Sequence, residues 1–258
     1  MATELVTELR AAGCVFAEEE AALLAEVAAG RHTAGTSEDA VRMTLAEFVA
    51  RRVAGEPLEY ILGFVEFCGS RYRLGPGVFI PRQRSELLVE EAARFSSGRI
   101  LDLCCGCGAL GLSLQRRIGG TIVGVDVSSE ALASAQANNL RQTYHGDLFD
   151  ALPESYRGQF AIIVANAPYV PTSAIAAMPR ESREFEPRSA VDGGADGMDI
   201  QRRILREAGA WLEPGGRLLT ETSEEQGPTL ATYAADLGWV ASLIHDHERG
   251  AHVLVVHR

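Results

Sequence analysis

Long apolar runs are missing from this sequence. No stretch of about 18 consecutive apolar residues occurs, so no transmembrane helix is expected. The start, Met-Ala-Thr-Glu-Leu, lacks the basic and apolar regions of a signal peptide. The five cysteines, three of which fall within 104–107, do not have the pattern of an extracellular disulfide framework. Together these absences favour a cytoplasmic protein without a membrane partner.

Basic residues are outnumbered in this chain. It has 24 lysines and arginines against 35 aspartates and glutamates, which gives a formal net charge of −11 at pH 7. Because phosphate binding depends on clustered basic side chains, a nucleic-acid partner is not expected. The cysteines include no second Cys-x-x-Cys pair, so no structural zinc site is expected and no metal is predicted. What the chain does have is 258 residues with 47% apolar content, enough to bury a sizeable core.

A glycine-rich turn between a strand and a helix is the first informative motif. An apolar run, Ile100–Leu103, leads into Cys104-Cys105-Gly106-Cys107-Gly108, and a helix-forming run follows. Glycines at such a turn let the backbone approach a ligand closely where a Cβ atom would collide. A second predicted strand ends at Asp126, 20 residues beyond Gly106, where a carboxylate can hold both ribose hydroxyls of a nucleoside. A further carboxylate, Asp147, follows a weak strand and is placed to meet the amino group of an adenine.

The second informative motif is Asn166-Ala167-Pro168-Tyr169, which follows the apolar run Phe160–Ala165. The run predicts a buried strand, so the motif lies at a strand end. The Asn166 side-chain oxygen and the Ala167 carbonyl can each accept one N–H of a planar NH₂ group, while the Tyr169 ring packs against the nitrogen or an incoming methyl group. Such a site orients the nitrogen lone pair toward an electrophile. Asn-x-Pro alone is common in turns, and its place after the glycine turn and two carboxylates, each at a strand end, makes it informative.

The order of predicted elements indicates an α/β fold preceded by a small helical domain. Apolar residues at helical spacing over residues 3–29 and a helix start at Ser37 predict a helical bundle over residues 1–55. Residues 56–82 are predicted to form a linker and β-hairpin, and residues 83–258 a parallel α/β domain. The predicted strands lie near 99–104, 121–126, 142–145, 160–165, 215–221, 239–244 and 251–257, and the predicted helices near 84–96, 108–118, 129–139, 198–212 and 226–237. Ligands in such sheets bind beyond the carboxyl ends of the strands, and the last two strands are expected to form an antiparallel hairpin.

These motifs, in this order, resemble those of class I S-adenosylmethionine-dependent methyltransferases that methylate planar amide or amino nitrogens. Further segments are similar to the protein glutamine N5-methyltransferases that modify peptide-chain release factors. They are the linker at 55–63, the hairpin segments at 65–69 and 77–82, the loop segments Phe185–Arg188 and Gly193–Met198, and Leu212–Gly216 with Glu221. The resemblance covers about residues 55–226.

The resemblance implies a Rossmann-like methyltransferase sheet that binds S-adenosylmethionine and acts on a glutamine in a release-factor-like loop of a protein substrate. The docking surface for that partner is expected to include the helical domain. The implied catalytic residues are Asn166, Ala167, Pro168 and Tyr169. The implied cofactor contacts are Phe79, Pro81, Arg82, Asp102, Cys104, Gly106, Gly108, Asp126, Val127, Asp147, Leu148 and Asn166. Glu186-Pro187-Arg188 is expected to brace the active-site loop rather than to act as an acid–base pair.

Several positions depart from the family pattern. Ala167 replaces a proline, so a fixed φ is lost while the carbonyl remains. Residues 82–86, Arg-Gln-Arg-Ser-Glu, stand where the family has Arg-Pro-Glu-Thr-Glu, so the base Arg84 replaces an acid beside the expected cofactor pocket. Cys104 stands where the first glycine of the cofactor loop often stands. These departures are typical of a divergent paralogue.

Two other functions stay open from the sequence alone. The departures at Gln83, Arg84 and Ala167 also fit a methyltransferase that acts on another planar nitrogen or on a small-molecule acceptor. Cys104 and Cys107 have the Cys-x-x-Cys spacing of redox enzymes, so a non-enzymatic cofactor-binding or redox module is the third interpretation. The competing interpretation of these cysteines is that they are small apolar residues of a cofactor loop.

Overall fold

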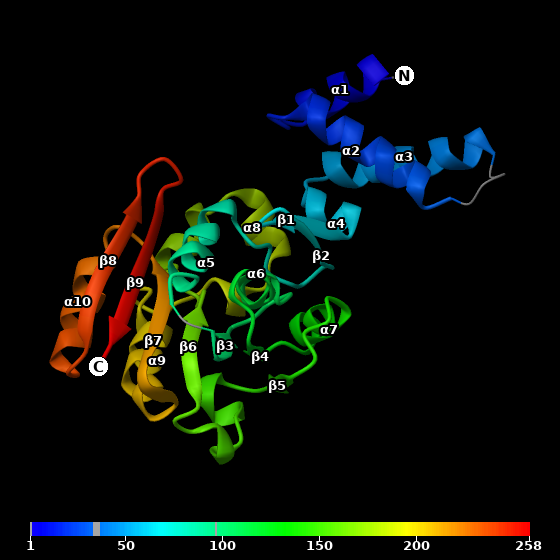
Figure 1. The fold of residues 1–258 in the computed structure, drawn as a ribbon. Coiled ribbons are helices and arrows are strands. Elements are labelled where there is room, and N and C mark those ends of the chain that lie inside the picture. Colours follow the sequence, from blue (N-terminus) through cyan, green and yellow to red (C-terminus); the bar gives the residue numbers. More distant parts are fainter. Residues whose placement is uncertain (1, 33–36, 96) are drawn as a thin grey trace.

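The computed structural model describes residues 2–32, 37–95 and 97–258, and these form one central sheet with helices on both faces (Figure 1). The order of the seven strands of this sheet is β5-β4-β3-β6-β7-β9-β8. The parallel strands are β3 (Arg99–Leu103), β4 (Thr121–Asp126), β5 (Thr143–His145), β6 (Phe160–Ala165) and β7 (Leu212–Thr222). Strands β8 (Val240–Asp246) and β9 (Ala251–His257) form the expected antiparallel hairpin, and β9 pairs with β7. The prediction of a mostly parallel α/β sheet is confirmed.

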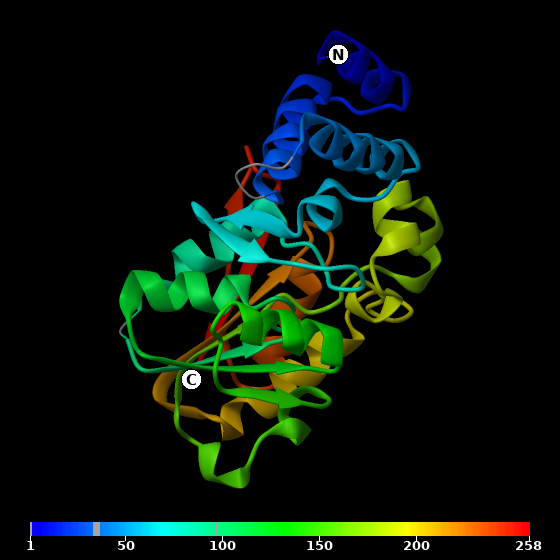
Figure 2. The same ribbon diagram turned by 90° about the vertical axis from the view of Figure 1, so that its right-hand side faces the viewer.

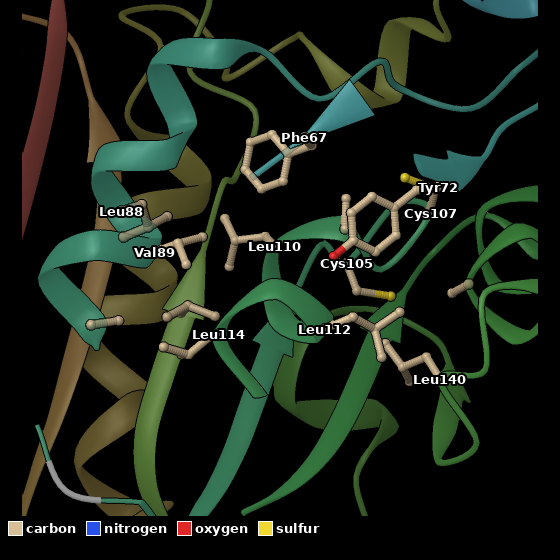
Figure 3. Packing of buried hydrophobic residues seen from close by; sticks show 14 of the residues in the cluster. Phe67, Tyr72, Leu88, Val89, Cys105, Cys107, Leu110, Leu112, Leu114 and Leu140 are labelled. Carbon is tan, nitrogen blue, oxygen red and sulfur yellow. The ribbon is translucent and has the colours of Figure 1, made fainter. Parts of the chain in front are cut away.

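Two apolar layers hold the helices against the sheet. One face is covered by α5 (Glu86–Ala92), α6 (Ala109–Ile118) and α7 (Ser129–Ala137), and the other by α9 (Asp199–Glu207) and α10 (Gly227–Asp236). Figure 3 shows side chains of α5, such as Leu88, packed beside those of α6, such as Leu110 and Leu114. All six residues of β6 are buried, as expected for a central strand covered on both faces. The sheet therefore provides a rigid base for the loops at its carboxyl edge.

Three of the predicted elements differ from the structure by more than two residues at one end. The helix predicted near 198–212 is α9, which ends at Glu207 and is followed by a 3₁₀ turn, η6 (Ala208–Ala210). Strand β7 begins at Leu212 rather than near 215, because a register shift between Phe160 and Ile162 of β6 accommodates Pro214 and its glycines. The helix predicted to begin near 84 consists of a 3₁₀ turn, η1 (Gln83–Ser85), followed by α5, which ends at Ala92. The last position of that prediction, residue 96, lies outside the described residues.

The N-terminal helices pack around a core of their own. They are α1 (Ala2–Ala11), α2 (Ala17–Gly30), α3 (Glu38–Val53) and α4 (Leu58–Leu62). Leu9, Leu24, Phe48 and Ile61 lie in one buried cluster, so the cluster extends past residue 55 into α4. The Ser37 side chain caps α3 by accepting a hydrogen bond from the Ala40 amide at 3.3 Å. Figure 2 shows this bundle beyond one end of the sheet domain.

A hairpin joins the bundle to the sheet domain. It is formed by β1 (Phe64–Phe67) and β2 (Ser70–Arg73), which pair antiparallel. Phe67 and Tyr72 are buried in the same cluster as α6, and the Tyr72 and Ser113 hydroxyls lie 2.6 Å apart. The short helix α8 (Arg180–Phe185) lies beside the bundle, where Arg52 of α3 donates to Glu181 at 2.6 Å. None of the described helices is both long enough and apolar enough to cross a membrane.

Candidate active site

A cavity opens where the carboxyl ends of β3, β4, β5 and β6 meet, and we call it the strand-end cavity. The empty space inside it, with the open mouth included, is about 1020 Å³. The predicted site residues that line it are Phe79, Pro81, Asp102, Cys104, Gly106, Asp126, Val127, Asp147, Leu148, Asn166 and Pro168. The structure therefore brings most of the predicted cofactor contacts together.

A second cavity, which we call the loop cavity, adjoins the first. Arg82, Arg84, Ala167 and Tyr169 are among its lining residues. The two cavities share four lining residues, namely Phe79, Asn166, Pro168 and Ala190. Since Asn166 is common to both, it lies where a ligand in one cavity meets a ligand in the other.

The turn after β3 forms one wall of the strand-end cavity. Cys104 and Gly106 have φ angles of +56° and +54°, in the left-handed region that favours glycine. A Cβ atom on Gly106 would meet nothing within 4 Å, so this glycine leaves open space beside the turn. At Cys104, which has a side chain, the left-handed conformation costs roughly 1–2 kcal/mol. The family often has a glycine at this position. Cys104 has a left-handed backbone conformation there, which a glycine adopts without strain.

Asp126, at the end of β4, fixes that turn and presents its carboxylate to the strand-end cavity. One carboxylate oxygen accepts from the Gly106 amide at 2.8 Å and the other from the Ser128 amide at 2.9 Å. Each oxygen retains a second lone pair for a hydroxyl donor such as those of a ribose. Burial raises the pKa of Asp126 above its ordinary value, although both amide donors act in the opposite direction. A ligand hydroxyl that donates to it would further favour the ionised form.

Asp102, in β3, is a second carboxylate in the wall of the cavity, and its side chain is buried. It accepts from the Gly111 amide at 2.9 Å, and a Cβ atom on Gly111 would lie only 2.7 Å from the same carboxylate oxygen. Burial, with a smaller effect of neighbouring Asp126, raises the pKa of Asp102 to about 7. The charge of this residue therefore changes near neutral pH.

Asp147 and Leu148 complete the cavity on the β5 side. The Asp147 carboxylate accepts from Arg203 of α9 at 2.9 Å, so it is partly engaged outside the cavity. Leu148 is buried and has a φ of +49°, an uncommon angle for a side-chain-bearing residue. This places an apolar side chain and a carboxylate side by side, which suits a heterocycle with an amino group.

Asn166 is oriented by a residue far away in the sequence. Its side-chain nitrogen donates to the Ser85 hydroxyl at 3.2 Å, and Ser85 is buried. No described residue donates to the other end of the amide, so the Asn166 oxygen is available to accept from a ligand. The contact fixes which end of the amide faces the cavities.

Tyr169 and Glu186 are held by arginines of the segment before α5. The Tyr169 hydroxyl accepts from Arg84 at 2.7 Å and donates to Glu221 at 3.1 Å. Burial raises the pKa of Tyr169 to about 12, so the hydroxyl stays protonated at neutral pH. Glu186 accepts from the Ile80 amide at 3.1 Å and from Arg82 at 2.6 Å. Glu186 thus braces the loop, as expected, and Arg82 is engaged with it.

The comparisons with known proteins agree with this geometry. A family model described as the methyltransferase small domain matches residues 75–180. A release factor glutamine methyltransferase of Geobacter sulfurreducens is 41% identical over 190 residues, which cover 70% of this chain and 66% of that protein. A protein of the same name from Bradyrhizobium diazoefficiens is 35% identical over 247 residues, which cover 88% of this chain and 83% of that protein. The chain belongs to the release factor glutamine methyltransferase family.

A solved structure supports the same fold. A methyltransferase from Pyrococcus furiosus superposes with a TM-score of 0.57 at 16% identity, over 73% of this chain and 88% of that chain. The expectation of a class I methyltransferase is therefore confirmed, and its methyl donor is S-adenosylmethionine.

The strand-end cavity fits this cofactor. Asp102 offers a buried carboxylate and Asp126 a partly buried one to a ligand that carries positive charge and two ribose hydroxyls. Phe79, Val127 and Leu148 offer apolar surface for the adenine and the methionine chain. When bound, the cofactor supplies an electrophilic methyl group on a sulfonium.

Two residues predicted to contact the cofactor lie elsewhere in this methyltransferase. Gly108 does not line either cavity, because a Cβ atom there would point at Leu140, 3.0 Å from its Cδ1 atom. Its glycine instead permits the left-handed turn, with φ +78°, that starts α6. Arg82 lines the loop cavity and not the strand-end cavity, and its ion pair with Glu186 holds it there.

The cysteines of the turn do not have the properties of a redox pair. Burial raises the pKa values of the Cys104, Cys105 and Cys107 thiols, that of Cys107 to about 12. Because the thiolate is the reactive form, these cysteines are poor nucleophiles at neutral pH. They pack as small apolar residues of the methyltransferase cofactor loop, and Figure 3 shows Cys105 beside Leu112 and Cys107 beside Tyr72.

Sequence reasoning missed the orienting role of Ser85 and the lining residue Ala190. Ser85 falls in the segment that was compared with the family's Arg-Pro-Glu-Thr-Glu, yet nothing local pairs it with Asn166, which is 81 residues away. Ala190 follows the Glu186-Pro187-Arg188 brace and closes both cavities. The only available signal was the proximity of each to a family-like segment.

Proposed function

We propose that this enzyme transfers a methyl group from S-adenosylmethionine to the side-chain amide nitrogen of a glutamine in a peptide-chain release factor. The substrate is taken from the names of relatives that are 41% and 35% identical. The proposal rests above all on Asn166, which lies at the junction of the two cavities. Its amide oxygen is available to accept a hydrogen bond from the substrate that receives the methyl group.

In this proposal the acceptor amide enters through the loop cavity. Its two N–H groups donate to the Asn166 oxygen and to the Ala167 carbonyl, which holds the nitrogen with its lone pair toward the strand-end cavity. An amide nitrogen is a poor nucleophile because its lone pair is delocalised into the carbonyl. Two acceptors on its protons raise its electron density, and the Tyr169 ring limits where the nitrogen can lie.

Closure of the site is the second contribution of the protein. The reaction removes the positive charge of the donor, so a partly dry pocket around that charge favours transfer. Phe79, Pro168 and Ala190 border both cavities, so they would shield from water the place where a bound donor and acceptor meet. The proton of the methylated amide leaves afterwards to water.

The substrate surface follows from the same assignment. Helices α1 to α4 and the β1–β2 hairpin lie on the side of α8, where Arg52 of α3 contacts Glu181, a lining residue of the loop cavity. We infer that a protein substrate contacts this helical bundle while one of its loops reaches the loop cavity. We place the reaction in the cytoplasm, in agreement with the sequence.

The decisive experiment is methyl transfer to purified release factor. Isotopically labelled S-adenosylmethionine is incubated with enzyme and release factor, and mass spectrometry locates the label. We expect one labelled glutamine, and no label in a release factor in which that glutamine is replaced by alanine. Label on another residue type, or transfer to a small-molecule or adenine acceptor but not to release factor, would contradict the proposal.

A further inference from the structure

Three side chains from distant parts of the chain meet behind the loop cavity. Arg84 of η1 donates through one guanidinium nitrogen to the Tyr169 hydroxyl at 2.7 Å and through its Nε to Glu221 of β7 at 3.1 Å. Tyr169 also donates to the same Glu221 oxygen at 3.1 Å, which closes a triangle. We call these residues the Arg84–Tyr169–Glu221 triad.

Within the triad Glu221 is a buried carboxylate, and Arg84 is its counter-charge among the described residues. The Glu221 side chain is 3% exposed, while that of Arg84 is 42% exposed. The second Glu221 carboxylate oxygen is buried and has no hydrogen-bond donor in the described part of the chain. Because a buried carboxylate without a counter-charge is strongly unfavourable, the guanidinium of Arg84 is required where it is.

Tyr169 is fixed at its backbone as well. The Gln226 side chain donates to the Tyr169 carbonyl at 2.9 Å and to the Asp196 carbonyl at 3.0 Å. Next to it, the Val170 amide donates to Val191 at 2.9 Å. Gln226 therefore holds one end of Tyr169, and the other end, the hydroxyl, depends on Arg84 and Glu221.

Ala167 makes these contacts more important. A proline there would fix φ near −65°, whereas alanine leaves the backbone of the catalytic segment with more conformational freedom. Side-chain contacts must then supply the rigidity that the backbone lacks. The Ser85 contact to Asn166 and the Arg84 contact to Tyr169 both come from η1, so this one turn holds the two ends of the segment.

We propose that Arg84 is a positioning residue for methyl transfer, which holds the Tyr169 ring against the acceptor nitrogen through the hydroxyl and is itself fixed by Glu221. This inference rests on the proposed function, because it assumes that the Tyr169 ring forms one wall of the site that binds the methyl acceptor. It predicts that the base at position 84 acts on the acceptor half of the reaction and not on cofactor binding.

The test is a double-mutant cycle with R84Q and Y169F. We expect R84Q to lower kcat about 10-fold, because a small displacement of an active-site group costs this much or more. We expect Y169F to cause a loss of similar size, and the double variant to be no slower than the slower single variant. The dissociation constant of S-adenosylmethionine should change less than 2-fold in all three variants.

The matched control is R94Q. Arg94 follows α5, its side chain is 71% exposed and its ion pair with Glu91 is 3.2 Å long. R94Q removes an arginine that lies at the other end of α5 from Arg84 and does not contact Tyr169. We therefore expect its kcat to equal that of wild type. A kcat loss in R84Q no larger than that in R94Q would overturn the proposal. The proposal would also be overturned if the kcat loss of the double variant equalled the product of the losses of R84Q and Y169F.

A third variant, R84K, separates positioning from folding. Lysine keeps the charge that Glu221 needs but has no planar fork to reach both partners, so we expect a folded enzyme with kcat between those of wild type and R84Q. The sequence contains no other lysine, so an amine-reactive reagent reports on this side chain together with the chain's α-amino group. Equal kcat values in R84K and R84Q, with both folded, would contradict a role for the cation.

An activity-independent measurement distinguishes failure of this inference from failure of the proposed function. The enzyme is labelled with 3-fluorotyrosine, and the Tyr169 resonance is assigned as the one that Y169F lacks. We expect a single resonance in wild type and R94Q, and a shifted or broadened resonance in R84Q. An unchanged Tyr169 resonance in R84Q overturns the inference even if release factor is methylated. If release factor is not methylated but the resonance moves, the triad stands and only the acceptor is wrong.

Discussion

The strand-end cavity and the loop cavity are built in different ways although they share a border. The strand-end cavity takes its carboxylates from the ends of neighbouring strands, within residues 102–148, and backbone amides such as that of Gly106 fix two of them. The loop cavity takes its polar groups from segments far apart in the chain, and it depends on side-chain contacts such as Arg84 to Glu221. The first is a property of the sheet, and the second is an assembly of side chains.

This difference explains where the chain departs from its family. Ala167 and Arg84 both belong to the loop cavity, where a changed side chain alters contacts without moving a strand. In the strand-end cavity Ser85 replaces a threonine and so keeps a hydroxyl, and Cys104 has a left-handed backbone conformation that glycine favours. Side chains of the acceptor half can therefore change without moving a strand, whereas the cofactor half depends on the backbone of the turn after β3.

The largest effect is expected at the border between the cavities. Asn166→Ala removes the acceptor for one amide proton, so we expect kcat to fall about 100-fold or more while the cofactor dissociation constant changes little. Steady-state kinetics and calorimetry measure the two quantities. An unchanged kcat would remove Asn166 from the mechanism, and a parallel loss of cofactor affinity would make the two cavities one functional unit.

A substitution at Asp126 is the converse experiment. Asp126→Asn keeps the shape but loses the charge and one acceptor for a ribose hydroxyl, so we expect cofactor affinity to fall about 10-fold. Asp150→Asn, on the exposed residue of η2 (Leu148–Ala151), is the control. At saturating cofactor kcat should return close to the wild-type value. Calorimetry that shows no loss of affinity would refute the ribose assignment.

The contrast between the cavities also determines what could be predicted from the sequence. Asp126, Gly106 and Asn166 were predictable because strand, turn and carboxylate follow one another locally. A Cβ atom on Gly108 would point to Leu140, whereas one on Gly106 would point into open space. The sequence did not indicate this difference, because it depends on how α6 docks. Arg84 and Glu221 are 137 residues apart, and no local pattern pairs them.

The pH dependence of Asp102 is expected to have a smaller effect. Its pKa of about 7 means that the carboxylate becomes charged near neutral pH, and the charged form favours a cationic ligand. We expect the affinity for S-adenosylmethionine to rise as the pH increases from about 6 to 8, and to rise less in Asp102→Asn. Calorimetry at several pH values measures this difference. Equal pH profiles for the two proteins would contradict the role of Asp102.

Asp102 affects the stability of the free enzyme in the opposite sense. Its pKa is higher in the folded protein, about 7, than the ordinary 3.8, so the folded state binds the extra proton between these values. The stabilisation is fully present below pH 3.8 and is lost as the pH rises through about 7. We therefore expect Asp102→Asn to have a higher thermal midpoint than wild type at pH 8 without cofactor, with a smaller difference at pH 5. A wild-type protein that is the more stable one at pH 8 would refute this sign.

The smallest effect is expected where the helical bundle contacts the loop cavity. Arg52 of α3 is buried and donates to Glu20 of α2 and to Glu181 of α8, each at 2.6 Å. Glu181 lines the loop cavity and its side chain is 45% exposed, so the pair is worth only about 0.2–1 kcal/mol. Glu181→Gln should therefore raise KM for the protein acceptor up to about 5-fold and leave kcat and cofactor affinity unchanged.

A matched control and a second acceptor show what this contact does. Glu184→Gln removes an exposed carboxylate from the same helix, where it pairs with Arg180 at 2.8 Å, and should leave KM unchanged. If the Arg52 contact aligns the bundle with α8 for a docked protein, a short glutamine peptide should show no difference between Glu181→Gln and wild type. If the peptide is affected as strongly as the protein, Glu181 acts on the cavity wall itself. The bundle would then contribute to binding of the protein substrate only through its own surface. The loop cavity, like the strand-end cavity, would not depend on the contact with the bundle.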